Sequence, residues 1–188
     1  MAEFEPVLLA NIRREDSHTL RVYEESGGYN TWKKVLQEWK PSEVIDVVKA
    51  SNLRGRGGAG FPTGLKWTFL TKDHPGPVYF CLNADESEPG TFNNRILMEQ
   101  DPHQVLEGLA LSCYATGAST AYFYMRYEYP LAWERCQAAV EEGYARGYFG
   151  KNILDSGYSL DVYLHRGAAA YICGEETGLI ESLEGRRA

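Results

Sequence analysis

The sequence predicts an α/β protein in which helices cover a mainly parallel β-sheet. Three short runs with strand character, residues 78–82, 121–127 and 160–164, alternate with longer segments of helical spacing. Strands that alternate with helices are typical of layered domains with a parallel sheet. We expect a Rossmann-like domain, but not one of the standard dinucleotide-binding type, because a predicted helix and not a strand precedes the glycine-rich segment.

The helices are predicted from their spacing and their start signals. Pro41 and Ser42 precede valines at helical spacing, and Pro102 and Pro130 suit the first turn of a helix. Asp73 to Pro77 is typical of a turn. The expected helical segments are 30–40, 44–50, 65–70, one that starts at Pro102 and runs through Cys113, 130–146 and 172–183.

Length and composition favour a single packed domain. The chain has 188 residues, 44% of them hydrophobic, which suffices for one core. We expect residues 1–40 to form a polar N-terminal arm and residues 41–188 to form the α/β domain. A formal net charge of −7 argues against a nucleic-acid partner. The sequence has no apolar run of membrane-spanning length and no secretion signal, so we expect a cytosolic protein.

Cysteine and histidine patterns argue against several enzyme classes. The four cysteines form no C-x-x-C pair, and we expect buried free thiols and no metal site in this chain. There is no H-E-x-x-H motif and no G-x-S-x-G motif. Hydrolase hypotheses therefore lose their usual support. The cysteines are Cys81, Cys113, Cys136 and Cys173.

The segment Arg54 to Trp67 predicts an anion site. It holds several glycines between two arginines and Lys66, so uncovered backbone amides and cations could hold a phosphate. Gly55, Gly57 and Gly60 match the dinucleotide fingerprint, but a helix precedes them. The P-loop pattern fails because Leu65 precedes the lysine. A flexible surface loop is the alternative for this segment alone.

Two further segments each follow a predicted strand, where ligands bind in α/β sheets. Asn83 to Gly90 carries Asp85, Glu86 and Glu88, whose carboxylates suit sugar hydroxyls; a solvated acidic turn is the alternative. His165 to Thr177 supplies small residues that would let a planar ligand approach closely. Its Glu175 and Glu176 fall at the start of a predicted helix, and the alternative is that they only stabilise the helix dipole. Together the three segments match what a mononucleotide such as flavin mononucleotide (FMN) needs, and Phe61 and Phe69 could stack an adenine.

These runs resemble the flavoprotein of respiratory complex I, the NADH-binding, F-type subunit of NADH–quinone oxidoreductase. The matching runs are Arg54 to Trp67, Asn83 to Gly90, Asp101 to Gly108 and Tyr171 to Arg187. NAD-linked soluble hydrogenases and formate dehydrogenases carry a similar flavin subunit and remain an alternative, as does a nucleotide-binding module without activity.

The resemblance implies a role for each matching residue. The FMN-binding residues would be Gly55, Arg56, Gly57, Gly58, Lys66, Asn83, Asp85, Glu86, Tyr171, Gly174, Glu175 and Glu176. The NADH-contacting residues would be Phe61, Phe69, Glu88 and Glu176. Glu88 and Glu176 would lie beside the nicotinamide, and no catalytic acid, base or nucleophile is obligatory.

The resemblance also implies that this chain is part of a longer polypeptide. The resemblance implies that the family continues into a ubiquitin-like domain and a helical domain with a 4Fe-4S cluster. We therefore expect an N-terminal fragment that alone holds flavin weakly or not at all. The implied reaction is hydride transfer from NADH to FMN, then single-electron transfer to iron–sulfur clusters and quinone. Implied partners are the other subunits of the complex I peripheral arm, especially the thioredoxin-like 2Fe-2S subunit, on the cytoplasmic side of the bacterial inner membrane.

Two positions depart from the family pattern. Ala169 stands where the family usually has glycine, and Gly178 stands where it usually has alanine. The extra methyl group at Ala169 could narrow the approach of the backbone to a cofactor. A glycine inside a helix costs about 1 kcal/mol relative to alanine.

Overall fold

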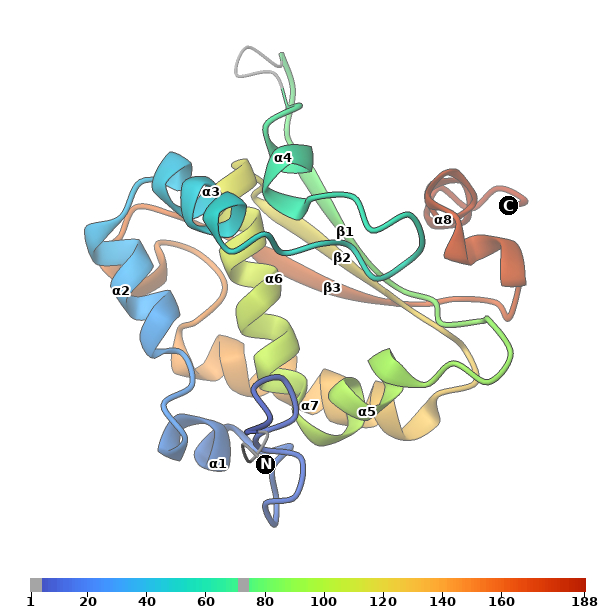
Figure 1. The fold of residues 1–188 in the computed structure, drawn as a ribbon, viewed down its shortest axis with the longest axis horizontal. Coiled ribbons are helices and arrows are strands. Elements are labelled where there is room, and N and C mark those ends of the chain that lie inside the picture. Colours follow the sequence, from blue (N-terminus) through green and yellow to red (C-terminus); the bar gives the residue numbers. More distant parts are fainter. Residues whose placement is uncertain (1–4, 71–74) are drawn as a thin grey trace.

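Three parallel strands form the sheet of this protein (Figure 1). The computed structural model describes residues 5–70 and 75–188. The strands β1 (Tyr79–Ala84), β2 (Thr120–Met125) and β3 (Asp161–Arg166) are arranged in that order, and both pairings are parallel. The predicted α/β class and the parallel sheet are therefore confirmed.

The helices agree with most of the predicted segments. The α-helices are α1 (Leu20–Glu25), α2 (Asn30–Glu38), α3 (Pro41–Ala50), α4 (Thr63–Trp67), α5 (Asn93–Gln100), α6 (Pro102–Thr116), α7 (Pro130–Arg146) and α8 (Glu176–Leu183). The short 3-10 helices are η1 (Ile153–Asp155) and η2 (Tyr171–Gly174).

Two parts of the helix prediction need correction. Helices α1 and α5 were not expected from the sequence. The helical pattern predicted over 172–183 is broken at Glu175, whose extended backbone separates η2 from α8. Part of the predicted turn at 73–77 lies outside the described residues.

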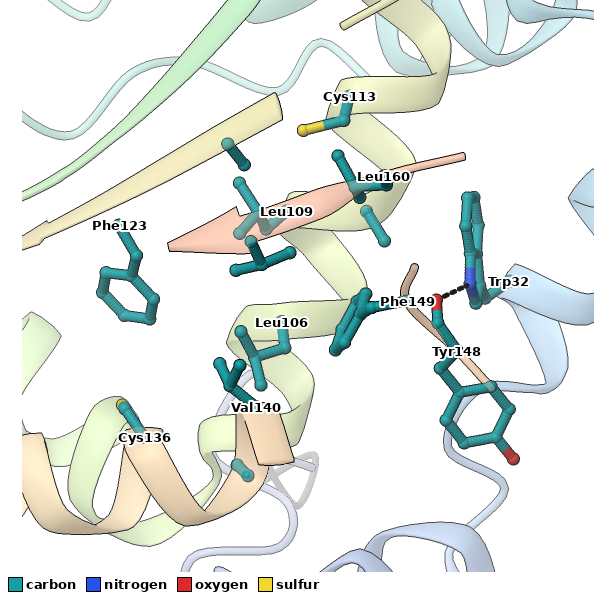
Figure 2. Packing of buried hydrophobic residues seen from close by; sticks show 14 of the residues in the cluster. Trp32, Leu106, Leu109, Cys113, Phe123, Cys136, Val140, Tyr148, Phe149 and Leu160 are labelled. Atoms are coloured by element: carbon teal, nitrogen blue, oxygen red, sulfur yellow. Dashed lines mark hydrogen bonds between the residues drawn. The ribbon is translucent and has the colours of Figure 1, made fainter. Parts of the chain in front are cut away.

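The core lies between one face of the sheet and helices α6 and α7. Phe123 of β2 lies there in one buried cluster with Leu106 and Leu109 of α6 and Cys136 of α7 (Figure 2). Val162 of β3 belongs to the same cluster. Each strand contributes alternate residues to this layer, as expected for side chains that point to opposite faces. The opposite face of the sheet receives much less cover.

Helices α1 and α2 pack into the same core. Tyr29 and Trp32 are fully buried. The rings of Tyr29 and Tyr148 stack with centroids 4.0 Å apart, and the Trp32 indole donates a 3.1 Å hydrogen bond to the carbonyl of Tyr148 (Figure 2). The N-terminal helices are thus held by aromatic packing, while the predicted division of the chain at residue 40 stays a prediction.

Buried polar side chains fix these helices onto α6. The Glu107 carboxylate accepts hydrogen bonds from the Tyr23 hydroxyl (2.5 Å), the Tyr29 amide (2.9 Å) and the Trp32 amide (3.0 Å). Because Tyr29 precedes the first residue of α2, Glu107 satisfies amides that the start of this helix leaves unpaired. Glu107 therefore caps a helix that is remote in the sequence.

A histidine extends this arrangement. His103 is fully buried, with Nδ1 3.2 Å from the Tyr29 hydroxyl and Nε2 2.9 Å from Oε2 of Glu142. Burial lowers the pKa of His103, against an opposing effect of Glu142. We call Tyr23, Tyr29, His103, Glu107 and Glu142 the Glu107 polar centre.

The cysteines differ in their environment. All four are free; Cys113, Cys136 and Cys173 are buried as predicted, but Cys81 is exposed. The expectation is wrong for Cys81 because its side chain belongs to the face of β1 that lies away from the core. Within residues 5–70 and 75–188, no cluster of three or more metal-ligating side chains is present, and no helix has the length and hydropathy to cross a membrane.

Candidate functional site

The glycine-rich segment forms a loop closed at its base. Arg54 and Pro62 make an isolated antiparallel bridge, and the Gly55 amide donates a 2.9 Å hydrogen bond to the Phe61 carbonyl. The Arg54 guanidinium reaches across the loop to the Gly60 carbonyl at 3.2 Å. These contacts hold the ends of the loop and leave its middle free.

The loop borders an open hollow of about 630 Å³. A Cβ atom built on Gly57 or Gly58 would meet no atom within 4 Å, and neither residue has a positive φ angle. Neither packing against the described residues nor backbone conformation therefore requires glycine there. The glycines instead suit the close approach of a ligand that a side chain would block. The hollow is lined by Ser51, Asn52, Leu53, Arg54, Gly55, Arg56, Gly58 and Gly60.

Lys66 links the glycine-rich segment to α8. It lies on α4, and its Nζ atom is 3.6 Å from Oε2 of Glu176. Both side chains are largely exposed, at 66% and 74%. Such a pair contributes little to stability and can exchange partners readily.

The acidic segment begins at the carboxyl end of β1, as predicted. Asp85 accepts a 2.8 Å hydrogen bond from the Ser87 hydroxyl on Oδ1, while its buried Oδ2 has no hydrogen-bond partner among the described residues. Desolvation raises the pKa of Asp85. An unpaired acceptor at this position suits a ligand that donates a hydrogen bond, such as a ribityl hydroxyl.

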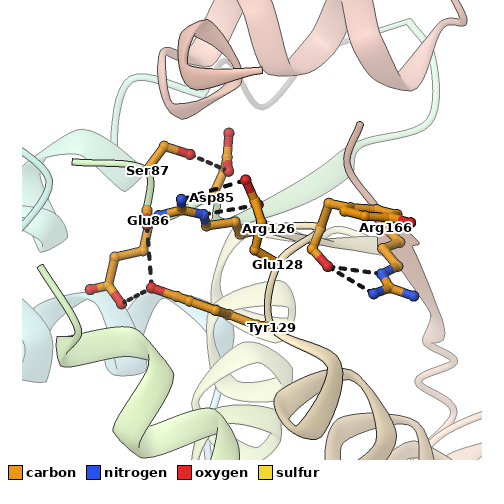
Figure 3. A network of polar contacts seen from close by, with 8 residues as sticks. Asp85, Glu86, Ser87, Arg126, Glu128, Tyr129 and Arg166 are labelled. Atoms are coloured by element: carbon orange, nitrogen blue, oxygen red, sulfur yellow. Dashed lines mark hydrogen bonds and ion pairs between the residues drawn. The ribbon is translucent and has the colours of Figure 1, made fainter. Parts of the chain in front are cut away.

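Glu86 makes its contacts inside the protein (Figure 3). Its carboxylate accepts hydrogen bonds from the Asn94 amide (2.9 Å), the Arg95 amide (3.1 Å) and the Tyr129 hydroxyl (3.2 Å). It thereby caps the start of α5, a helix that the sequence did not predict. A direct role of Glu86 toward flavin stays a prediction.

Arg126 was missed by the sequence-based reasoning. Its guanidinium donates to the Glu86 carbonyl at 2.5 Å and to the Glu128 carboxylate at 2.9 Å, so it holds the backbone of the acidic segment (Figure 3). Arg126 directly follows β2, but the strand predicted over 121–127 included it, so the strand-end rule that found Asn83 did not select it.

The third segment lies against the second. The Tyr171 hydroxyl donates a 2.6 Å hydrogen bond to Glu88, and the Asn83 side-chain amide donates a 2.8 Å hydrogen bond to the Gly174 carbonyl. A Cβ on Gly174 would come within 3.3 Å of the Asp85 carbonyl, which favours a small residue. The structure therefore brings together residues that are more than 80 positions apart.

Glu175 caps α8. Its Oε2 atom accepts hydrogen bonds from the amides of Thr177 (2.9 Å) and Gly178 (3.0 Å) and from the Thr177 hydroxyl. These hydrogen bonds, that of the Thr177 hydroxyl first, lower the pKa of Glu175. The helix-start interpretation of this glutamate is confirmed, and its predicted contact with flavin stays a prediction.

The predicted aromatic pair lies beside the glycine-rich loop. The rings of Phe61 and Phe69 are 5.8 Å apart between centroids and are tilted by 58°. Both side chains are exposed. Exposed aromatic rings at this distance offer a surface on which a flat heterocycle can stack.

The two departures from the family pattern have structural consequences. Ala169 has a φ angle of 61°, in the left-handed region that favours glycine. A Cβ on Gly178 would lie 2.6 Å from the Ile172 carbonyl oxygen, so glycine allows η2 to approach α8 closely.

Comparisons with known proteins identify the family of this chain. The family described as the Nuo51 FMN-binding domain matches residues 48–188. An NADH-quinone oxidoreductase F subunit of Rhizobium meliloti (strain 1021), the one numbered 2, is 58% identical over 185 residues, covering 98% of this chain and 44% of the relative. The corresponding F subunit of Aquifex aeolicus (strain VF5) is 54% identical, covering 96% of this chain and 42% of the relative.

A solved structure shares the fold. An NAD+-reducing [NiFe]-hydrogenase in the H2-reduced state superposes with a TM-score of 0.75 at 34% identity, covering 96% of this chain and 28% of that chain. The chain spans less than half the length of the curated relatives described above. The match over residues 48–188 shows that the chain belongs to the family of the Nuo51 FMN-binding domain.

Proposed function

We propose that this chain forms the FMN- and NADH-binding part of an NADH dehydrogenase. The observation that carries the proposal is the glycine-rich loop, whose Gly57 and Gly58 leave space that no described residue fills. Hydride transfer from NADH to FMN, followed by single-electron transfer, is the chemistry that the bound group supplies. The 4Fe-4S cluster that the resemblance implies would be held by the part of the longer relatives that lies outside the matched region.

The phosphate of FMN suits the glycine-rich loop. The amides of residues 55–58 and the cationic side chains of Arg56 and Lys66 would bind it, because uncovered amides and cations favour an anion. Lys66 would then exchange its exposed carboxylate partner, Glu176, for the phosphate. Asn83 and Asp85 would hold the ribityl chain and the ring edge, with the unpaired Oδ2 of Asp85 as an acceptor.

The third segment would close the other side of the site. Tyr171, Gly174 and Glu176 would line the flavin and the nicotinamide, while Glu86 and Glu175 would contribute chiefly through the helices that they cap. Phe61 and Phe69 would stack the adenine of NADH, and Glu88 would contact the nicotinamide side. Since positioning is the protein's main contribution, no acid or base need touch the reacting atoms.

We further propose that the chain acts within complex I. Its partners would be the other subunits of the peripheral arm, especially the thioredoxin-like 2Fe-2S subunit, with quinone as the final acceptor. The complex would lie on the cytoplasmic side of the bacterial inner membrane. The names of the curated relatives, both NADH-quinone oxidoreductase subunits, support this assignment.

One observation favours a second candidate. The likeness to the NAD+-reducing [NiFe]-hydrogenase supports a diaphorase flavin subunit of a soluble hydrogenase, in which the same site would serve a different acceptor. The subunits that co-purify with the native protein distinguish the two. A nucleotide-binding module without activity remains the third candidate.

The test uses a chimera in which this chain replaces the matched region of the full-length Rhizobium meliloti relative. The chimera is reconstituted with FMN without oxygen, and the visible flavin absorbance is followed after addition of NADH. We expect rapid bleaching. Bound flavin that NADH does not bleach would overturn the nicotinamide assignment, and absence of bound flavin in a folded chimera would overturn the FMN assignment.

A further inference from the structure

The outer face of the sheet, away from α6 and α7, carries a patch of exposed and half-buried side chains. We call Tyr79, Cys81, Tyr122 and Tyr163 the tyrosine face. We propose that the tyrosine face docks an amphipathic helix from the polypeptide that lies outside the matched region in the longer relatives. This proposal concerns a surface that the flavin and NADH assignment does not use.

Strand register defines the tyrosine face. Cys81, Tyr122 and Tyr163 are direct partners across the three strands, and Tyr79 lies two residues before Cys81 on the same side of β1. The intervening residues Phe80 and Leu82 pack against the core instead. The sheet therefore has one apolar face inside the core and a second aromatic face outside it.

The tyrosine rings form a continuous surface. Ring centroids are 6.2 Å apart between Tyr79 and Tyr122 and 5.8 Å apart between Tyr122 and Tyr163. Tyr79 and Tyr163 remain 56% and 52% exposed. Adjacent exposed rings of this kind form an amphipathic surface that is typical of interfaces, because each ring buries a large area and its hydroxyl still finds a partner.

The topology explains why this face is open. Parallel sheets are covered on both faces in almost all folds. Connections between parallel strands are right-handed, so two successive crossovers in the same direction place their helices on the same face. The connections from β1 to β2 and from β2 to β3 run in one direction, and α6 and α7 both pack on the inner face. The outer face must therefore be covered by polypeptide outside these crossovers.

The carboxyl end of the sheet shows how such cover is built. There Tyr124, on the outer face of β2, is fully buried beside Cys173 of η2 and Leu179 of α8. Its hydroxyl lies 2.9 Å from the Ser182 hydroxyl. A helix with apolar residues and a hydroxyl group thus covers the last outer tyrosine of β2, and the remaining tyrosines lack the same kind of cover.

The length of the relatives indicates which polypeptide could cover the tyrosine face. The chain covers 44% and 42% of the two curated relatives, so more than half of each relative's polypeptide lies outside the matched region. The proposed partner of the tyrosine face is a helix from that polypeptide, with an apolar stripe and with polar groups that bind the tyrosine hydroxyls. A second copy of this chain is the competing occupant.

Cys81 offers a direct probe, since the other three thiols are buried. The 188-residue chain and the chimera described above are treated with iodoacetamide at mildly alkaline pH, and labelling of the Cys81 peptide is followed by mass spectrometry. We expect Cys81 to be labelled about tenfold or more slowly in the chimera, because a docked helix must open before the thiol reacts. The control is Ala138→Cys on α7, an exposed position on the opposite side of the core, whose labelling should be equal in the two proteins.

The outcomes separate the alternatives. Equal labelling of Cys81 in the two proteins would overturn the proposal. Protection of Cys81 in the 188-residue chain that rises with concentration, together with a dimer in sedimentation, would assign the face to a second copy and would also overturn it. In the chimera, Tyr122→Lys should restore fast labelling of Cys81, whereas Lys34→Tyr at an exposed position of α2 should not. Because labelling does not depend on flavin, loss of FMN binding would leave this result intact.

Discussion

The Glu107 polar centre and the Lys66–Glu176 pair of the candidate site hold their polar groups in opposite ways. Glu107 is 7% exposed and accepts three hydrogen bonds from α1 and from the start of α2. Lys66 and Glu176, in contrast, form a single exposed pair across two segments. Buried groups that are fully paired specify how helices dock, whereas exposed pairs can be exchanged for ligand contacts at little cost.

The largest expected effect is at the polar centre. Glu107→Ala should lower the free energy of unfolding by about 3 kcal/mol or more, because a buried hydroxyl and two buried amides lose their acceptor. Urea unfolding measures the change. Glu107→Gln keeps one carbonyl acceptor and should cost clearly less. A loss below about 1 kcal/mol for the alanine variant would show that the N-terminal helices are held by aromatic packing alone.

The second-largest effect on stability is expected at Gly178, where α8 lies close to η2. Gly178→Ala should lower stability by about 1–2 kcal/mol, because its Cβ would lie 2.6 Å from the Ile172 carbonyl oxygen and the backbone must shift. The matched control is Gly108→Ala in α6, where a Cβ would meet nothing within 4 Å. That control should gain up to about 1 kcal/mol from helix propensity. Equal gains in thermal unfolding would refute the steric account of Gly178.

Substitution of Ala169 by glycine should change the stability in the opposite direction. Ala169→Gly should raise stability by about 1 kcal/mol, because it relieves a φ angle of 61°. Ala170→Gly is the control and should lower stability. Ala170 has an ordinary φ angle of −97°, and glycine there adds freedom to the unfolded chain and removes a methyl group that packs near Cys173. If both variants lose stability in chemical denaturation, the strain at Ala169 is not significant.

The pH dependence tests His103. Burial keeps the folded-state pKa of His103 below its ordinary value, so the unfolded chain binds a proton more readily. The His103 contribution is present above pH 6.5 and is lost as the pH falls below that value. Unfolding free energies measured between neutral and mildly acidic pH should decline for the parent chain, and the decline should be smaller for His103→Gln. An identical slope in the variant would assign the decline to other groups.

The smallest effect on stability is expected at the glycine-rich loop. Gly57→Val should change the free energy of unfolding by less than about 0.5 kcal/mol, because its side chain meets no protein atom. The same variant in the chimera should bind FMN at least about tenfold more weakly, since the side chain fills the phosphate approach. Normal FMN binding in equilibrium dialysis would contradict the proposal that the glycine-rich loop binds the phosphate. A large loss of stability would show that the loop is part of the core.

Local signals in the sequence predicted much of the fold. Pro130 and the following spacing predicted α7 to its last residue, Arg146, and the apolar run at 78–82 predicted β1. These signals succeed because helix starts and strand periodicity depend on neighbouring residues. Helix α5 was missed because its cap, Glu86, precedes it by several residues and was interpreted as a ligand.

The site was predicted in part for the same reason. Asn83, Glu88, Tyr171 and Gly174 were chosen from separate segments, and the structure joins them through the pairs Tyr171–Glu88 and Asn83–Gly174. Arg126 was missed because its role depends on the backbone of a segment 40 positions away. Which of the chosen residues contact FMN or NADH stays a prediction.

By itself, the sequence determined the α/β class, the parallel strands, the three ligand-type segments and the family. Only the tertiary structure decided that Glu107 caps α2, that α1 and α2 share the main core, and that the tyrosine face lies open. The reason is physical: periodicity and caps act over a few residues, whereas these features depend on contacts between groups that are distant along the chain. Such contacts are set by packing and desolvation, for which the local pattern carries no direct signal.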